Sequence, residues 1–280
     1  WTRLLDLTQK FEPVMGTNSG GKRLPAVSLY INYYRPFRIH VKQLLQLPIK
    51  GGVDPSARGS VIIQTMFWRV LIDGENCGAW NMAVDEALLE GMQSPQALPT
   101  LRLYAWNPAC LSLGLSQPGR EADLPALQHR KWDLVRRPTG GRAILHTDEL
   151  TYSLCLPIHH PLVSGGVIDS YQRIVPFLLN GLKRLNLAGT ADRQYNPGPS
   201  PANQNPVCFE TPSNYEVTVA GRKLIGSAQS RRKYGVLQHG TLPLSGDLTR
   251  ITQVLAFPSP AERAQAAQRL LEHALTIQDV

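Results

Sequence analysis

Residues 215–244, YEVTVAGRKLIGSAQSRRKYGVLQHGTLPL, decide the fold. Runs of apolar and β-branched residues alternate here with turn residues, and Ala220 and Gly221 form the first turn. The pattern predicts three consecutive strands, at residues 215–219, 223–230 and 236–244. Strands joined by such short turns pair in antiparallel fashion, so this stretch indicates an antiparallel sheet.

Shorter strand patterns precede this stretch, at residues 101–105, 109–115, 133–137 and 149–156. In the first of them Leu101 and Leu103 alternate with Arg102 and Tyr104, which is typical of a half-buried strand. The glycine turn at residues 140–141 separates two of the other patterns.

Helical periodicity predicts three helices, which begin near Trp80, span residues 171–185 and follow Ser259. We expect Asn81 to cap the first helix and Asp85 to lie near its positive end. Pro176 should kink the second helix. Together with the strands, these helices predict an α+β fold, a mostly antiparallel β-sheet with packed helices.

The net charge of +8 is concentrated at the start of the 280-residue chain. Residues 1–65 hold nine of the 29 basic and three of the 21 acidic residues, which leaves only +2 for residues 66–280. We expect residues 1–65 to be an arm that is disordered or not native to the protein, and residues 66–280 to form one folded domain. The weak charge of that domain argues against a nucleic-acid partner.

The four cysteines, Cys77, Cys110, Cys155 and Cys208, show no CxxC spacing. Their spacing argues against a zinc site and a disulfide framework, so we expect a reduced, cytoplasmic protein without a metal site. The apolar runs are shorter than the roughly 18 residues that a membrane helix needs, and we therefore expect no membrane partner.

Residues 136–143, RRPTGGRA, form a basic, glycine-containing turn between two predicted strands. Paired glycines let a backbone approach a ligand closely, and their N–H groups can hold an anion or a carbonyl oxygen. A hairpin turn with exposed arginines is the simpler interpretation of this segment taken alone.

Cys208 follows a Pro-rich segment at residues 188–207, and Lys223 follows the turn at Gly221. A cysteine is more often a small buried hydrophobe than a nucleophile, and a lysine at a hairpin turn is normally solvated. The loop position of Cys208 favours a function, because functional residues concentrate on loops. His146 and His239 lie on predicted strands or their edges, where structural histidines are the default.

Three blocks taken together resemble the catalytic domain shared by lipoate-protein ligases, biotin ligases and octanoyltransferases. They are NMAVDEA at residues 81–87, RRPTGGRA extending to His146, and GRKLIGSAQ at residues 221–229 extending to QHGTL at residues 238–242. The resemblance covers residues 66–280. Members of the family generally extend beyond Val280, which leaves a C-terminal truncation open.

Within this superfamily, the segment CFETPS at residues 208–213, followed by Tyr215-Glu216, is most similar to protein N-octanoyltransferases. Lipoate ligases usually carry an Asn-Asp pair before this hairpin. The resemblance implies an enzyme without a cofactor, whose donor is octanoyl-acyl carrier protein. Its acceptor would be a lysine of a lipoyl domain, in glycine cleavage H protein or in an acyltransferase subunit of a dehydrogenase complex.

The resemblance also implies roles for individual residues. Cys208 matches the family's nucleophile, which forms an acyl-thioester intermediate, and Lys223 matches the lysine that activates it. A nearby ammonium raises the thiolate fraction of a thiol. The family's substrate-binding positions match Arg137, Gly140, Gly141, Arg142, His146, Gly226, Ser227, Ala228, His239 and Gly240. The basic run at residues 231–233 suggests docking of an acidic carrier protein, with a solvated turn as the alternative.

Two other functions stay open on the sequence. An ATP-dependent lipoate-protein ligase would use Lys223 to contact the activated acyl group and would not need Cys208. A non-catalytic protein that binds a lipoyl domain or nucleic acid would keep the fold without turnover. The presence of both Cys208 and Lys223 argues against this last function.

Overall fold

The computed structural model describes residues 29–31, 67–191 and 216–280. The proposed nucleophile Cys208 and most of the Pro-rich segment lie outside the described residues. The arm expected at residues 1–65 also lies outside them, except for strand β1 (Leu29–Ile31), which pairs in parallel with strand β2 (Trp68–Asn76).

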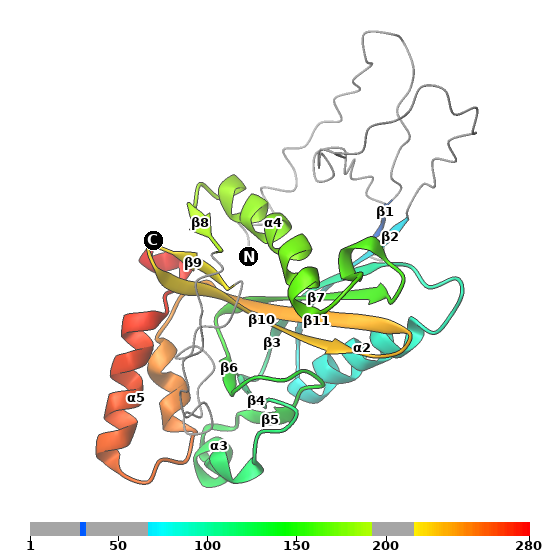
Figure 1. The fold of residues 1–280 in the computed structure, drawn as a ribbon. Coiled ribbons are helices and arrows are strands. Elements are labelled where there is room, and N and C mark those ends of the chain that lie inside the picture. Colours follow the sequence, from blue (N-terminus) through cyan, green and yellow to red (C-terminus); the bar gives the residue numbers. More distant parts are fainter. Residues whose placement is uncertain (1–28, 32–66, 192–215) are drawn as a thin grey trace, which may run out of the picture.

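An eight-stranded sheet in the order β1-β2-β3-β7-β11-β10-β9-β8 forms the centre of the molecule (Figure 1). Its other strands are β3 (Thr100–Trp106), β7 (Glu149–Pro157), β8 (Gly189–Thr190), β9 (Val217–Val219), β10 (Arg222–Arg231) and β11 (Gly235–Pro243). Strand β2 pairs with β3 in parallel, whereas every neighbouring pair from β3 to β8 along this order is antiparallel. The predicted antiparallel meander and the α+β class are therefore confirmed.

The turn between β9 and β10 has the backbone that a two-residue hairpin requires. Ala220 has φ 49° and Gly221 has φ 76°, so both central residues are left-handed. Turns of this kind match the twist of the flanking strands. The turn fixes the register of β9 against β10, in which Thr218 lies opposite Lys223.

A second, three-stranded sheet contains β4 (Cys110–Leu113), β5 (Asp133–Arg136) and β6 (Ile144–His146) in the order β5-β4-β6. Strand β5 pairs with β4 in parallel, and β6 pairs with β4 in antiparallel fashion. The basic glycine segment therefore joins two strands that lie on opposite sides of β4. The hairpin interpretation of this segment was wrong, because its flanking strands both pair with β4 and not with each other.

The helices of the described ranges are α2 (Gly78–Gly91), α3 (Leu124–Arg130), α4 (Val167–Arg184) and α5 (Pro260–His273), with short 3-10 turns at Gly119–Glu121, Pro161–Val163, Leu248–Gln253 and Ile277–Asp279. Pro176 lies inside α4, and Ser259 caps α5 by accepting a hydrogen bond of 3.2 Å from the Glu262 N–H, as predicted. None of these helices combines the length and apolar character needed to cross a bilayer.

Two expectations for the first helix were wrong. Helix α2 begins at Gly78, whose N–H donates to the Asp133 carboxylate at 2.8 Å, so a residue of β5 satisfies the helix start. Asn81 and Asp85 consequently lie inside the helix, and both are fully buried. Neither residue caps the helix, and both are available for contacts with the sheet.

The eight-stranded sheet is covered on both faces (Figure 1). Helix α4 packs on one face, against Leu101 and Leu103 of β3. Helix α2 and the three-stranded sheet lie on the other face, where Tyr104 packs in one cluster with Met82. Strand β3 is therefore not half-buried as predicted, since Arg102 and Tyr104 on its polar side are fully buried beneath α2.

Candidate functional site

A narrow cavity lies between the eight-stranded sheet and the three-stranded sheet. It contains about 390 Å³ of space that no atom fills, its open mouth included. The structure brings seven of the ten expected substrate-binding residues to its walls: Arg137, His146, Gly226, Ser227, Ala228, His239 and Gly240. Residues from two distant sequence blocks, 136–146 and 221–242, thus face each other across one space.

The other three expected binding residues, Gly140, Gly141 and Arg142, lie beside the cavity and not in its lining. They hold Arg137, whose Nη2 donates to the carbonyl oxygens of Gly140 at 2.9 Å and Arg142 at 2.7 Å. Gly141 has φ 95°, and its carbonyl oxygen would lie 1.9 Å from a Cβ atom at Gly114. The glycines therefore permit two segments of this chain to approach each other.

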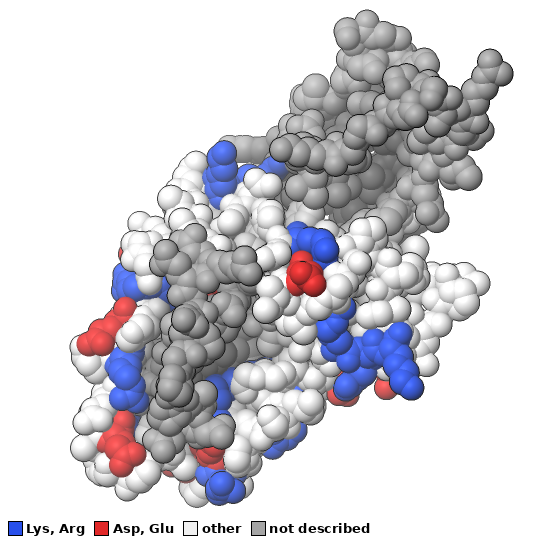
Figure 2. All heavy atoms as spheres, viewed as in Figure 1, with Lys and Arg blue, Asp and Glu red and all other residues white. Residues whose placement is uncertain are grey.

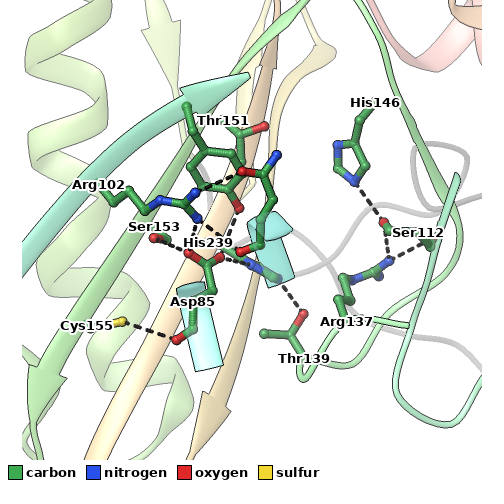
Figure 3. Close-up of polar contacts among 12 residues, drawn as sticks. Asp85, Arg102, Ser112, Arg137, Thr139, His146, Thr151, Ser153, Cys155 and His239 are labelled. Atoms are coloured by element: carbon green, nitrogen blue, oxygen red, sulfur yellow. Dashed lines mark hydrogen bonds and ion pairs between the residues drawn. The ribbon is translucent and has the colours of Figure 1, made fainter. Parts of the chain in front are cut away.

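Thr139, His239 and Asp85 form a hydrogen-bonded chain with the imidazole in the middle. Nε2 of His239 lies 2.7 Å from Oγ1 of Thr139, and Nδ1 lies 3.2 Å from Oδ2 of Asp85. Figure 3 shows these side chains in line, with Thr139 on the loop after β5, His239 on β11 and Asp85 on α2. Burial lowers the pKa of His239, although the Asp85 carboxylate opposes that effect.

Asp85 is the centre of a buried polar network under α2. Its carboxylate accepts hydrogen bonds from Arg102 at 2.9 Å, Ser153 at 2.7 Å and Tyr104 at 2.9 Å. Burial raises the pKa of Asp85, but His239 and Arg102 outweigh burial and hold this pKa below its ordinary value. The carboxylate is therefore ionised at neutral pH, and Arg102 balances its charge.

A second chain of the same kind runs through His146. Nε2 of His146 lies 2.8 Å from Oγ of Ser112, and Nδ1 lies 2.7 Å from Oε1 of Glu149. Arg137 donates to the same Ser112 hydroxyl at 3.2 Å, as Figure 3 shows. The His146 ring stacks on Trp106, with 4.0 Å between the ring centroids. This ring is therefore fixed by contacts on its face and at both nitrogens.

Lys223 is buried on β10, and its side chain is only 5% exposed. The ammonium forms an ion pair with Glu216, which precedes β9. Lys223 is thus not the solvated lysine expected of a hairpin turn. It shares its strand with the cavity residues Gly226, Ser227 and Ala228 but lies outside the cavity lining.

The basic run after β10 divides into two parts. Arg231 donates to the hydroxyl of Ser170 at 2.7 Å and to the carbonyl oxygens of Val163 and Gly165, both at 2.8 Å. It therefore holds the start of α4. Arg232 and Lys233 are exposed at the β10–β11 turn, where basic side chains gather in Figure 2.

Sequence reasoning missed the buried polar residues that support the cavity. Arg102 and Tyr104 alternate on β3, and Asn81 and Asp85 lie four residues apart on one face of α2. Their spacing, two residues on the strand and four on the helix, places each pair on one face of its element, and this pattern could have identified them. Within the described ranges, no group of three or more His, Cys, Asp or Glu side chains is placed to hold a metal ion.

Comparisons with known proteins agree on one group. The lipoyl protein ligase A/B catalytic domain matches residues 78–280. Octanoyltransferase LipM of Kyrpidia tusciae is 42% identical over 216 residues, which cover 76% of this chain and 79% of that protein. The LipM of Carboxydothermus hydrogenoformans is 44% identical over 193 residues, or 69% of this chain and 70% of that protein. LipM of Bacillus subtilis is 36% identical over 222 residues, which cover 78% of this chain and 80% of that protein.

Solved structures share the fold. A bipartite lipoate protein ligase from Thermoplasma acidophilum has a TM-score of 0.60 at 23% identity and covers 76% of both chains. Lipoate-protein ligase A bound with ATP has a TM-score of 0.59 at 23% identity, covering 76% of this chain and 77% of that chain.

Proposed function

The chain belongs to the lipoyl protein ligase A/B catalytic domain family, and on this premise we propose that it is an octanoyltransferase acting in protein lipoylation. Its donor is octanoyl-acyl carrier protein, and its acceptor is a lysine of a lipoyl domain. The acyl group passes through a thioester on Cys208. The identity to octanoyltransferases over more than two thirds of their length supports the transfer.

The shape of the cavity is the observation that carries this proposal. One wall consists of Gly226, Ser227 and Ala228 on β10 and Gly240 on β11, and these strands are paired so that Gly240 lies opposite Ser227. Trp106 contributes apolar surface to the same cavity. A narrow slot with small side chains suits an unbranched acyl chain, which can lie between the two sheets where a branched group would clash.

The chemistry of the proposed route needs no ATP. The Cys208 thiolate attacks the thioester carbonyl of the donor, and the carrier-protein thiol leaves. Because one thioester replaces another, this exchange is nearly isoenergetic, and the later formation of an amide is downhill. A free thiol with a pKa of about 8.5 is only a few per cent thiolate at pH 7, and the buried ammonium of Lys223 supports the anion.

An acidic donor suits the exposed cations at the β10–β11 turn. Arg232 and Lys233 are exposed there, whereas Arg231 is engaged in holding α4. Charges at such a rim raise the rate of association more than the final affinity. We therefore assign the docking of the carrier protein to Arg232 and Lys233.

We predict that Gly240→Ala overpacks the sheet behind the wall of the slot, because a side chain at residue 240 points toward Tyr152, on the face that α4 covers. A Cβ atom at residue 240 would lie 2.6 Å from Tyr152 Cε1 and 2.7 Å from the Gly226 carbonyl oxygen. Overpacking of this kind should lower the free energy of unfolding by about 1–3 kcal/mol and, by displacing β11 from β10, slow acyl loading. Urea unfolding measures the first effect, and the mass of the acyl adduct measures the second.

Gly181→Ala is the matched control, because a Cβ atom there meets open space on helix α4. It should raise the free energy of unfolding by roughly 0.5–1 kcal/mol and leave loading unchanged. Wild-type loading in Gly240→Ala would contradict the predicted displacement of this wall.

The function is tested by intact mass spectrometry after the protein is mixed with octanoyl-acyl carrier protein in the absence of ATP. We expect an octanoyl adduct that hydroxylamine removes, and its transfer to an added lipoyl domain. Free octanoate without ATP should give no adduct. If no adduct forms, and the lipoyl domain is modified only when ATP and free octanoate are supplied, the protein is a ligase.

A further inference from the structure

We propose that a second cavity, which adjoins the acyl cavity, binds the side chain of the acceptor lysine, and that Glu149 holds the ammonium group of this lysine. The inference deepens the proposed function and rests on it, since an octanoyltransferase takes an amine as its second substrate. It assigns a site to residues that the family resemblance leaves without a role.

The second cavity continues the first along the same two strands. On β7 and β11, the facing residues Thr151 and Thr241 line the acyl cavity. Two residues further along, the facing residues Glu149 and Pro243 line the second cavity. Residues two apart on a strand share one face of the sheet. Ile144 on β6 lines both cavities, so the two spaces meet at this residue.

The second cavity is acidic, whereas the acyl cavity contains a buried cation. The second cavity has about 460 Å³ of space that no atom fills, its open mouth included. Asp148, Glu149 and Asp247 line it, and its described lining residues include no Lys, Arg or His. Arg250 pairs with Asp148 from outside this lining and offsets one of the three charges. The acyl cavity is lined by the buried guanidinium of Arg137, which repels an arriving ammonium.

Glu149 offers a carboxylate oxygen that the described residues leave without a donor. Its side chain is only 5% exposed. Oε1 accepts a hydrogen bond from the Thr151 hydroxyl at 2.6 Å and lies 2.7 Å from Nδ1 of His146, and both of these residues line the acyl cavity. No described residue donates to Oε2, which is therefore the oxygen left for the second cavity. An ammonium supplies both the missing donor and the opposite charge.

The apolar part of the second cavity suits the stem of a lysine side chain. A lysine carries its ammonium on a flexible stem of four carbons, which packs on apolar surface while the charged head finds a polar partner. A small inorganic cation would gain nothing from apolar walls, and an anion would be repelled by the carboxylates. The apolar lining residues are Ile144, Leu145, Pro243, Leu248, Ile251 and Leu270.

The second cavity lies towards the end of the acyl cavity that is nearer to Lys223. Strands β10 and β11 are antiparallel, so the start of β10, with Lys223, lies beside the end of β11, with Pro243. In the proposed function, Lys223 supports the reacting thiolate. An amine bound in the second cavity is thus held on the side of the acyl cavity where the transfer is proposed to occur.

A double-mutant cycle on binding tests the pair. Calorimetry measures the affinity of the protein for a lipoyl domain with its acceptor lysine, and for the same domain with that lysine replaced by methionine. The wild type should bind the lysine form about 10- to 100-fold more tightly, as expected for a hydrogen bond to a charged group. In Glu149→Gln this ratio should fall to about threefold or less, because an amide carries no charge. Each protein is compared with itself, so a general change in its docking surface cancels.

Two further variants complete the test. Asp247→Asn removes a charge at the exposed rim and leaves Glu149 and its partners in place, so it keeps the inference testable if Glu149→Gln does not fold. It should lower the ratio by about two- to threefold through weaker attraction of the ammonium. Glu86→Gln is the matched control, because it removes an exposed carboxylate of α2 that does not line the cavity, and it should keep the wild-type ratio.

Two results overturn the inference: a wild-type protein that binds the lysine and methionine forms equally, or a ratio that is the same in wild type, Glu149→Gln and Asp247→Asn. Neither result depends on octanoyl loading. Failure of the wild-type protein to form an octanoyl adduct would overturn the proposed function instead and would leave this ratio unchanged.

Discussion

Replacing Cys208 by serine should abolish octanoyl loading and lower transfer to a lipoyl domain by at least about 10³-fold, measured as adduct mass and as modified acceptor. A serine hydroxyl stays protonated at pH 7, and an ammonium such as that of Lys223 offers no lone pair to remove the proton. An oxygen ester, if it formed, would also pass its acyl group to an amine more slowly than a thioester does.

The described cysteines explain why the effect should be confined to Cys208. Cys110 and Cys155 are fully buried, and burial raises the pKa of both thiols, so they stay protonated. Cys77 is exposed at the start of α2 and provides the matched control. Cys77→Ser should load normally. Persistent loading in Cys208→Ser, or its loss in Cys77→Ser, would place the nucleophile elsewhere.

The largest effect on stability is expected for Arg102→Met. The Arg102 guanidinium is fully buried and donates to Asp73 at 2.7 Å, to the Asp85 carboxylate at 2.9 Å and to Asn81 Oδ1 at 2.8 Å. Its loss leaves Asp85 buried without its main cation. Breaking a buried pair in this way costs about 3–5 kcal/mol, which urea unfolding measures.

A double variant separates the pair from simple loss of packing. If the charge of Asp85 causes the penalty, adding Asp85→Asn to Arg102→Met should recover part of the lost free energy. Arg130→Met is the control, because the exposed Arg130 only lies over the Trp132 ring, and its loss should cost about 1 kcal/mol or less. A change below 1 kcal/mol in Arg102→Met would contradict the assigned role of the network.

Most of the long strands and helices could be predicted because each has its own local signal, but β2, β6 and α3 were not predicted. The turn at Ala220 and Gly221 and the cap at Ser259 depend only on neighbouring residues, and both occur where expected. The residues of the cavity wall were predicted only from the family resemblance, because a small residue such as Gly240 carries no local sequence pattern that marks a binding site.

The errors have a different physical origin. The N–H of Gly78 at the start of α2 donates to Asp133, which lies 55 residues away in the sequence. Local capping rules therefore could not locate the start of this helix. Strand β3 is covered on both faces, and period-two alternation cannot distinguish a polar side that faces water from one that faces Asp85. These features depend on tertiary contacts, and no window of sequence contains both partners.

The position of β11 affects how the protein folds while it is synthesised. This strand is the last of the sheet in chain order, yet it lies between β7 and β10, and its His239 bonds to Asp85 across 154 residues. Contacts of such long range form slowly, because the loop must close first. During synthesis, one edge of β7 therefore stays unpaired until residues 235–243 have left the ribosome. Until then, this edge can pair with neighbouring chains. Yield should thus depend on the speed of synthesis and on crowding by other nascent chains.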